Sequence, residues 1–219
     1  MTITIKYDKS IKDETISTYT HQWATDFGDL IEVAHTTRYY GTFSGSLDYN
    51  NRIISAEFES PIEGSNTAII FSGTLFGSDG GAIYKENYIQ SLEFGASVIP
   101  ANAGNTNEAK QLEQVQLKFE GLNIEGDFGY SLCSISRALN SDPGKPYQGG
   151  IDHGTYSLIR GKAGAMLEHL KTQGIDVDIP LKDLAIASQF ASSEVIADAP
   201  IPVIDTIGVA DNSDISLVA

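Results

Sequence analysis

The segment Val115-Gln116-Leu117-Lys118-Phe119 alternates apolar and polar side chains at every step. Successive side chains of a β-strand point to opposite faces, so this alternation predicts a strand with one buried and one solvated face. Runs over 54–58 and 90–94 share this period of two, and a shorter run over 3–6 predicts a strand at the N-terminus. Glycine and asparagine clusters separate the runs, as hairpin connections require. The sequence therefore predicts one meandering antiparallel sheet over residues 40–124.

Segments with helical spacing of apolar residues precede and follow the predicted sheet in the sequence. Large apolar residues recur every three or four positions over 16–27, which predicts a helix with Thr15 or Ser17 as its N-cap and Gly28 at its end. After Tyr130, three apolar sets each share a helical face: Leu132, Ile135 and Leu139; Met166, Leu167 and Leu170; Leu181, Leu184 and Ala185. Strands followed by helices are typical of an α+β domain with helices packed on one face of the sheet.

Composition and charge narrow the function classes. A chain of 219 residues without a Pro/Gly/Ser-rich linker in its first two thirds predicts a single domain. The net charge of -15 excludes nucleic acid as a partner, because the chain would repel phosphates. No apolar run approaches the ~18 residues that a membrane-spanning helix needs. We therefore expect a protein that is not membrane-embedded.

Enzyme signatures are missing from the sequence. There is no Gly-x-Ser-x-Gly elbow, His-Glu-x-x-His motif, Cys-x-x-Cys motif or phosphate-binding Gly-x-x-x-x-Gly-Lys-Ser/Thr loop. Cys133 falls on the apolar side of a predicted helix, and the four histidines lack zinc-ligand spacing. Asp152-His153 keeps a small hydrolase as a distant alternative. We expect a protein that is not an enzyme.

Three segments resemble the HasA family of secreted haem-binding proteins, the hemophores. They are Gln22-Trp23-Ala24-Thr25-Asp26-Phe27-Gly28-Asp29, Ala185-Ile186-Ala187-Ser188-Gln189-Phe190, and the C-terminal Asp214-Ile215-Ser216-Leu217-Val218-Ala219. The resemblance implies a curved antiparallel sheet backed by helices, with two loops at one end that hold haem. It also implies a monomeric, extracellular carrier of ferric b-type haem, which takes part in iron acquisition and delivers haem to a TonB-dependent outer-membrane receptor.

The two ends of the chain bear on its export. The N-terminus lacks the charged and apolar regions of a cleavable signal peptide. Residues 205–219 are acidic and end in a short apolar cluster, which resembles the uncleaved C-terminal signal of type I secretion, a route that hemophores use. We expect a hemophore-like domain over 1–195 and a flexible acidic tail over 196–219 that engages the type I secretion machinery. An ordinary frayed end remains the alternative.

The same resemblance raises the question of which residues bind haem iron. In the family a tyrosinate from the second loop binds the iron, often with a histidine from the first loop. The segment Gly73-Thr74-Leu75-Phe76-Gly77 places Gly77 at the tyrosine position. His35, in the predicted first loop, and Tyr84, after the glycines of the second loop, are the predicted iron ligands. A solvent-facing His35 and a Tyr84 that packs at the sheet end are the alternatives.

Three further tyrosines are predicted to line the haem pocket. Tyr39 and Tyr40 flank the first loop, where one of them can instead be a core residue, and Tyr156 matches a pocket tyrosine of the family. Because the usual ligand is missing, a second function stays open. The chain can be a haem-ligand-deficient paralogue that acts as a receptor-binding or other protein-interaction module.

Overall fold

The computed structural model describes residues 2–37, 43–48, 53–76, 86–101, 110–142, 145, 147, 149–185 and 187–189. Seven strands are named in this part of the chain: β1 (Thr4–Tyr7), β2 (Phe43–Asp48), β3 (Ile53–Glu59), β4 (Thr67–Phe76), β5 (Glu86–Pro100), β6 (Lys110–Glu125) and β7 (Ala187–Gln189). The helices are α1 (Ile16–Phe27), α2 (Leu30–Thr37), α3 (Phe128–Leu139), α4 (Gly154–Leu158) and α5 (Gly164–Thr172), with short 3-10 helices η1 (Lys9–Ile11) and η2 (Leu181–Asp183).

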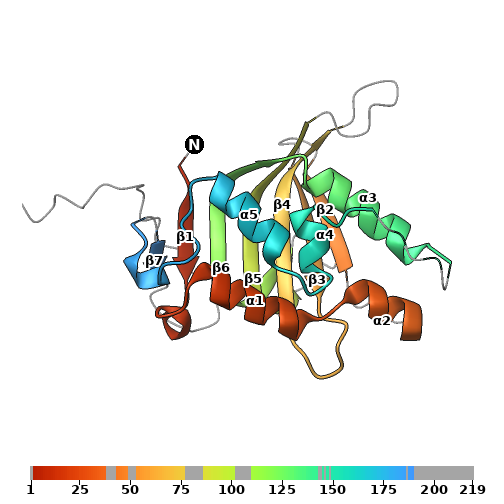
Figure 1. Ribbon diagram of the computed structural model, residues 1–219, viewed down its shortest axis with the longest axis horizontal. Helices are drawn as coiled ribbons and strands as arrows, with labels where there is room; N and C mark the ends of the chain where they lie inside the picture. Colours follow the sequence, from red (N-terminus) through yellow and green to blue (C-terminus); the bar gives the residue numbers. More distant parts are fainter. Residues whose placement is uncertain are drawn as a thin grey trace, which may run out of the picture.

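The strands form one sheet in the order β2-β3-β4-β5-β6-β1-β7. All neighbouring pairs from β2 to β1 are antiparallel, which confirms the predicted meander. The last strand, β7, pairs parallel with β1. Both ends of the described chain therefore join the same edge of the sheet. Helices α1, α4 and α5 lie across one face of the sheet, as an α+β fold requires (Figure 1).

Helix α1 forms because its sequence combines a good N-cap with a continuous apolar face. The Thr15 side chain accepts a hydrogen bond from the backbone N–H of Thr18, and the Thr18 side chain accepts one from the N–H of Thr15. This reciprocal pair satisfies two N–H groups that a helix start leaves free. At the other end Gly28 has φ +80°, a conformation that favours glycine. The predicted helix and both its boundaries are confirmed.

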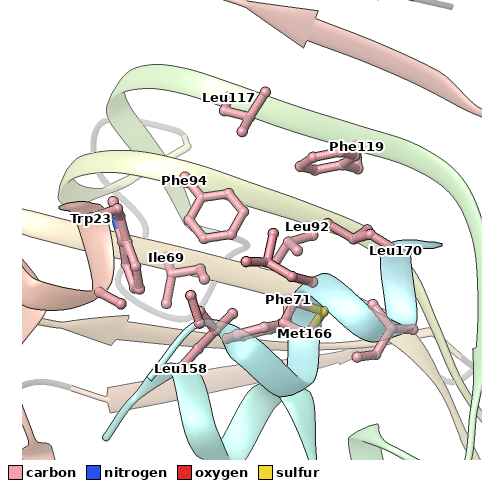
Figure 2. Close-up of a cluster of buried hydrophobic side chains, with 14 of the residues drawn as sticks. Trp23, Ile69, Phe71, Leu92, Phe94, Leu117, Phe119, Leu158, Met166 and Leu170 are labelled. Carbon is pink, nitrogen blue, oxygen red and sulfur yellow. The ribbon is translucent and has the colours of Figure 1, made fainter. Parts of the chain in front are cut away.

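The main core lies between the helices and the sheet (Figure 2). Phe94 from β5 is fully buried and contacts three other rings. Its ring centroid lies 6.1 Å from that of Tyr19, 5.0 Å from Trp23 and 6.4 Å from Phe119, all in edge-to-face geometry. Leu158 of α4 and Met166 and Leu170 of α5 point at the sheet from the layer of helices, on the same face as α1. The aromatic stripe of α1 is core, as predicted.

A β-bulge changes which face one predicted core residue occupies. Phe94 pairs with Leu117, but its neighbour Gly95 pairs with Val115, so Gln116 is an extra residue on β6. The alternation had placed Val115 on the same face as Leu117. The structure instead packs Val115 against a second, smaller cluster, which contains Ala68, Ile70, Leu112 and Val98. That prediction was wrong because an inserted residue shifts the side-chain period by one.

The last predicted helical set forms only a single 3-10 turn, η2. Leu181 and Leu184 are buried but Ala185 is exposed. The backbone N–H of Leu181 donates to the Glu14 carbonyl at 2.8 Å, and that of Lys182 donates to the Lys12 carbonyl at 3.0 Å. These bonds satisfy N–H groups that a helix start leaves free, and the turn ends at Leu184, whose backbone is extended at φ -74° and ψ 124°. The apolar pattern was correct about the burial of Leu181 and Leu184 and wrong about Ala185 and about the helix.

Candidate functional site

The predicted first loop begins with a helix rather than an open loop. Apolar Leu30, Ile31 and Ala34 are buried at helical spacing, and together they form the packed face of α2. The side chain of Asp29 accepts hydrogen bonds from the N–H groups of Ile31 at 2.9 Å and Glu32 at 3.0 Å. A carboxylate in this position stabilises the start of a helix. His35 was predicted to lie in a loop, and the structure places it in this helix instead.

The start of α2 is fixed to the end of α4 by an ion pair. Arg160 donates to Asp29 through Nε at 3.0 Å and through Nη2 at 2.9 Å, and both groups are only partly exposed. The backbone N–H of Leu30 also donates to the Ile159 carbonyl at 2.9 Å. Two backbone segments that are far apart in sequence are thus held together where the predicted haem loop begins.

His35 lies in the last turn of α2 and contacts the end of α3. Its Nε2 atom lies 2.8 Å from the Ala138 carbonyl oxygen and 3.3 Å from the Ser141 hydroxyl. Because a carbonyl oxygen only accepts hydrogen bonds, Nε2 carries the hydrogen in this arrangement. The imidazole therefore satisfies a carbonyl in the last turn of α3, and Nε2 can bind iron only by exchanging this partner for the metal.

Tyr156 is buried in α4, next to the same junction. The guanidinium carbon of Arg160 lies 5.8 Å from the centre of its ring. Burial raises the pKa of Tyr156, which the nearby Arg160 offsets only in part. Its hydroxyl is enclosed and has no hydrogen-bond partner among the described residues. Leaving an enclosed hydroxyl without a hydrogen-bond partner costs about 1–3 kcal/mol. A ligand group that forms a hydrogen bond with the Tyr156 hydroxyl would therefore be favoured here.

Several predicted site residues cannot be compared with the structure. Tyr39, Tyr40, Tyr84 and Gly77 lie outside the described residues. Their roles stay predictions. His153, half of the hydrolase alternative, does lie in the described part. Its ring stacks on that of Tyr130, with 5.8 Å between centroids and an interplanar angle of 13°.

Tyr147 is a residue that the sequence reasoning missed. It follows α3 and packs partly buried against the main core. The polar side chains of Ser134 and Arg137 lower the pKa of its hydroxyl. A tyrosine between Pro146 and the pair Gly149-Gly150 was the available signal, since glycines allow a chain to pass close to a helix.

The histidine and tyrosine side chains of this site suit haem better than a bare metal ion. Imidazole nitrogen and phenol oxygen are both known axial donors to haem iron. Among the residues that the structure describes, no group of three or more His, Cys, Asp or Glu side chains could hold a metal ion. The unpartnered Tyr156 hydroxyl adds a buried polar atom beside the same helices. The described residues are therefore compatible with haem.

Comparison with known proteins identifies the family. The family model described as heme-binding protein A (HasA) matches residues 1–219. This chain belongs to the HasA family. The apo hemophore HasA from Yersinia pestis is 28% identical, with a TM-score of 0.64 over 89% of this chain and 99% of that one. The holo form from the same organism is also 28% identical, with a TM-score of 0.62 over 87% and 99% of the two chains.

A tyrosine-to-alanine variant of HasA from Yersinia pseudotuberculosis, solved as a monomer, gives the same identity and TM-score as the holo form. No curated protein sequence matches the chain.

No helix in the described part of the chain is both long and apolar enough to cross a membrane. The hemophore resemblance and the α+β fold inferred from the sequence are confirmed, and the chain is a haem-binding carrier of this family.

Proposed function

We propose that this protein scavenges haem outside the cell and delivers it to a TonB-dependent outer-membrane receptor. The observation that carries this proposal is the HasA family match over residues 1–219. Similarity to both an apo and a holo hemophore supports a carrier that exists with and without its cargo. A carrier needs a site on loops and helix ends that can open, and the junction of α2, α3 and α4 supplies the helix ends.

The cargo in this proposal is ferric b-type haem. Covalent attachment as in c-type haem needs a Cys-x-x-Cys-His motif, and Cys133 is the single cysteine of the chain. His35 is the proposed imidazole ligand of the iron, and Tyr84 is the proposed tyrosine ligand. Tyr39, Tyr40 and Tyr156 are the proposed pocket residues. The protein acts as a monomer in this proposal.

Titration of the purified protein with ferric haem tests the function directly. We expect saturable one-to-one binding, seen as a shifted Soret band and quenched Trp23 fluorescence. His35→Ala should change the iron spin state and weaken binding by about 10-fold or more, because even an outer partner of a metal ligand contributes that much. His21→Ala is the matched control, since His21 is exposed on α1.

The result that contradicts the proposal is a wild-type protein that binds haem no better than an unrelated acidic protein. The haem-ligand-deficient paralogue would then be the better account. In that case the purified chain should still bind the receptor when no haem is present. A spectrum identical for wild type and His35→Ala would remove His35 from the site and leave the carrier function standing.

Export is the second part of the proposal. We expect deletion of residues 211–219 to abolish secretion through a type I apparatus and to leave the fold intact, because this acidic and apolar end resembles a type I signal. The measurement is the amount of protein in the culture medium relative to the cells. The far-UV circular dichroism and thermal midpoint of the truncated chain serve as the control. Unchanged export of the truncated chain would rule out a signal at this end.

A further inference from the structure

A cavity of about 330 Å³ lies between α1 and the strands β4, β5 and β6. Small-molecule sites have volumes of about 300–1,000 Å³, so this cavity has room for a small ligand. Neither His35 nor Tyr156 lines it. The cavity is therefore separate from the described residues of the proposed haem site.

The cavity forms where β5 and β6 depart from regular pairing. Gln116 is the extra residue of β6 at the bulge opposite Phe94 and Gly95. A bulge can re-aim a side chain, and the Gln116 side-chain oxygen accepts a hydrogen bond of 2.9 Å from the Tyr19 hydroxyl. A β-carbon at Gly95 would overlap the Gln114 carbonyl oxygen. The bulge thus places an amide in the wall, and the glycine leaves space beside it.

The wall of the cavity offers both hydrogen-bond donors and acceptors. Four amide side chains line it: Gln22, Asn66, Gln114 and Gln116. Each amide has a carbonyl acceptor and two N–H donors. Trp23 also lines the cavity, and its Nε1–H, which can only donate, has no partner among the described residues. A well-matched occupant must therefore both donate and accept hydrogen bonds.

The charge of the wall excludes anionic ligands. Glu14 and Asp26 line the cavity, and no Lys, Arg or His is among the described residues that line it. Burial raises the pKa of Tyr19, and the negative charges of Glu14 and Asp26 raise it further. The potential at this wall is therefore negative, and a carboxylate such as a haem propionate is repelled.

Hydroxyl groups match this wall better than an ammonium group does. An ammonium group only donates, so the amide N–H groups and the Trp23 Nε1–H would stay without an acceptor. A neutral hydroxyl donates and accepts and carries no charge. The Trp23 ring packs against Phe27 and Phe94, with 5.0 Å between centroids in both pairs. Trp23 is therefore suited to act through its N–H and not as a stacking surface.

We propose that this cavity binds a neutral saccharide. The amides of Gln114 and Gln116 contact its hydroxyl groups from β6, and Gln22 and Asp26 contact them from α1. The Trp23 Nε1–H donates to one of its oxygen atoms. This inference goes beyond haem transport and does not depend on it.

Nuclear magnetic resonance of the haem-free protein tests the proposal. The chain has one tryptophan, so its indole N–H gives a single cross-peak that reports on the cavity. We expect a saturable shift of this peak with D-glucose, D-galactose or N-acetyl-D-glucosamine, with a Kd on the order of 1 mM. The Kd should be the same in ~1 M salt, because a neutral ligand is insensitive to screening.

Two variants and a matched control locate the binding site. Ala96→Leu fills the cavity from β5, so it should weaken binding at least 10-fold. Gln114→Ala removes an exposed amide and should weaken binding about 5-fold through lost hydrogen bonds. Gln111→Ala is the control, because Gln111 lies on the same strand and does not line the cavity. Far-UV circular dichroism establishes that each variant is folded.

The source of the saccharide is distinguished by comparing free sugars with dextran, a neutral glucose polymer. A shift with a free sugar shows that one sugar unit is enough, and a shift with dextran alone assigns the site to a polymeric glycan. Both results support the proposal. No shift with any of these four probes overturns it, as does unchanged binding by a folded Ala96→Leu variant.

A cationic ligand gives a different result. A saturable shift with putrescine that disappears in ~1 M salt, without a shift for the sugars, assigns the cavity to an organic cation and overturns the proposal. Haem titration is a separate measurement on other residues. Failure of the saccharide proposal therefore leaves the haem-carrier function standing.

Discussion

Phe94→Ala is expected to lower the free energy of unfolding by about 3–5 kcal/mol, the usual cost of removing a buried ring. Phe94 is fully buried and joins α1 to the middle of the sheet through contacts with Tyr19, Trp23 and Phe119. The alanine leaves a cavity that rigid neighbours on two layers cannot fill. Small domains have total stabilities of about 5–15 kcal/mol, so this loss is a large share.

Urea unfolding followed by far-UV circular dichroism measures this effect. Trp23 fluorescence is a second probe, although its starting intensity will differ because Phe94 packs against the indole. Tyr130→Ala is the control, since that ring is 48% exposed and its removal should cost far less. A loss below about 1 kcal/mol for Phe94→Ala would contradict the packing described for this core.

Asp127→Asn is expected to destabilise the protein by about 3 kcal/mol at neutral pH, because it neutralises a buried carboxylate that several donors satisfy. The Asp127 side chain is fully buried at the start of α3. It accepts hydrogen bonds from the backbone N–H groups of Gly154 and Thr155 and from the Ser131 hydroxyl. His169 Nε2 lies 3.2 Å from its Oδ2 atom. One carboxylate therefore ties together α3, α4 and α5.

The stability due to Asp127 depends on pH in a defined direction. Burial works to raise the pKa of Asp127, but the nearby His169 side chain and the hydrogen bond from the Thr155 backbone N–H outweigh it, so the pKa lies below its ordinary value. A group whose pKa is lower in the folded state stabilises the protein above its unfolded pKa of ~3.9. This contribution is lost as pH falls through the folded pKa. Acid should therefore destabilise the wild type more than Asp127→Asn.

Unfolding free energies measured from pH 7 down to pH 2.5 test this prediction. The difference between wild type and Asp127→Asn should be largest at pH 7 and should shrink below pH ~4, where the unfolded state binds the proton before the folded state does. Asp178→Asn is the control, because Asp178 is exposed near the end of the domain. A difference that stays constant over this pH range would show that the charge of Asp127 contributes nothing.

Patterns within short segments were enough to predict helix α1 and the strands β3, β5 and most of β6. The cap at Thr15, the apolar face of α1 and the glycine at 28 lie within one stretch of 14 residues, and each acts on its neighbours. The alternation in β3, β5 and most of β6 predicted strands for the same reason, since a period of two needs no distant partner. The family resemblance added the haem-carrier function, which periodicity alone does not specify.

Sites were harder to predict than elements, because a side chain's role depends on what is packed against it. His35 was predicted to lie in an open loop, yet the buried face of α2 and the carbonyl of Ala138 place it in a helix with a partner. Tyr147 was missed in the sequence, because the side chains that lower the pKa of its hydroxyl, Ser134 and Arg137, come from another segment of the chain. Tyr39, Tyr40 and Tyr84 remain predictions.

The sequence by itself determined the fold class, the position of α1, the antiparallel order of the central strands and the family. Each follows from spacing or motifs within short segments. Only the tertiary structure decided the bulge that moves Val115 to the other face, the parallel pairing of β7 with β1, and the junction of Asp29 with Arg160. These features join residues up to the full length of the domain apart. Their energies come from contacts that form when the layers pack, so no local pattern encodes them.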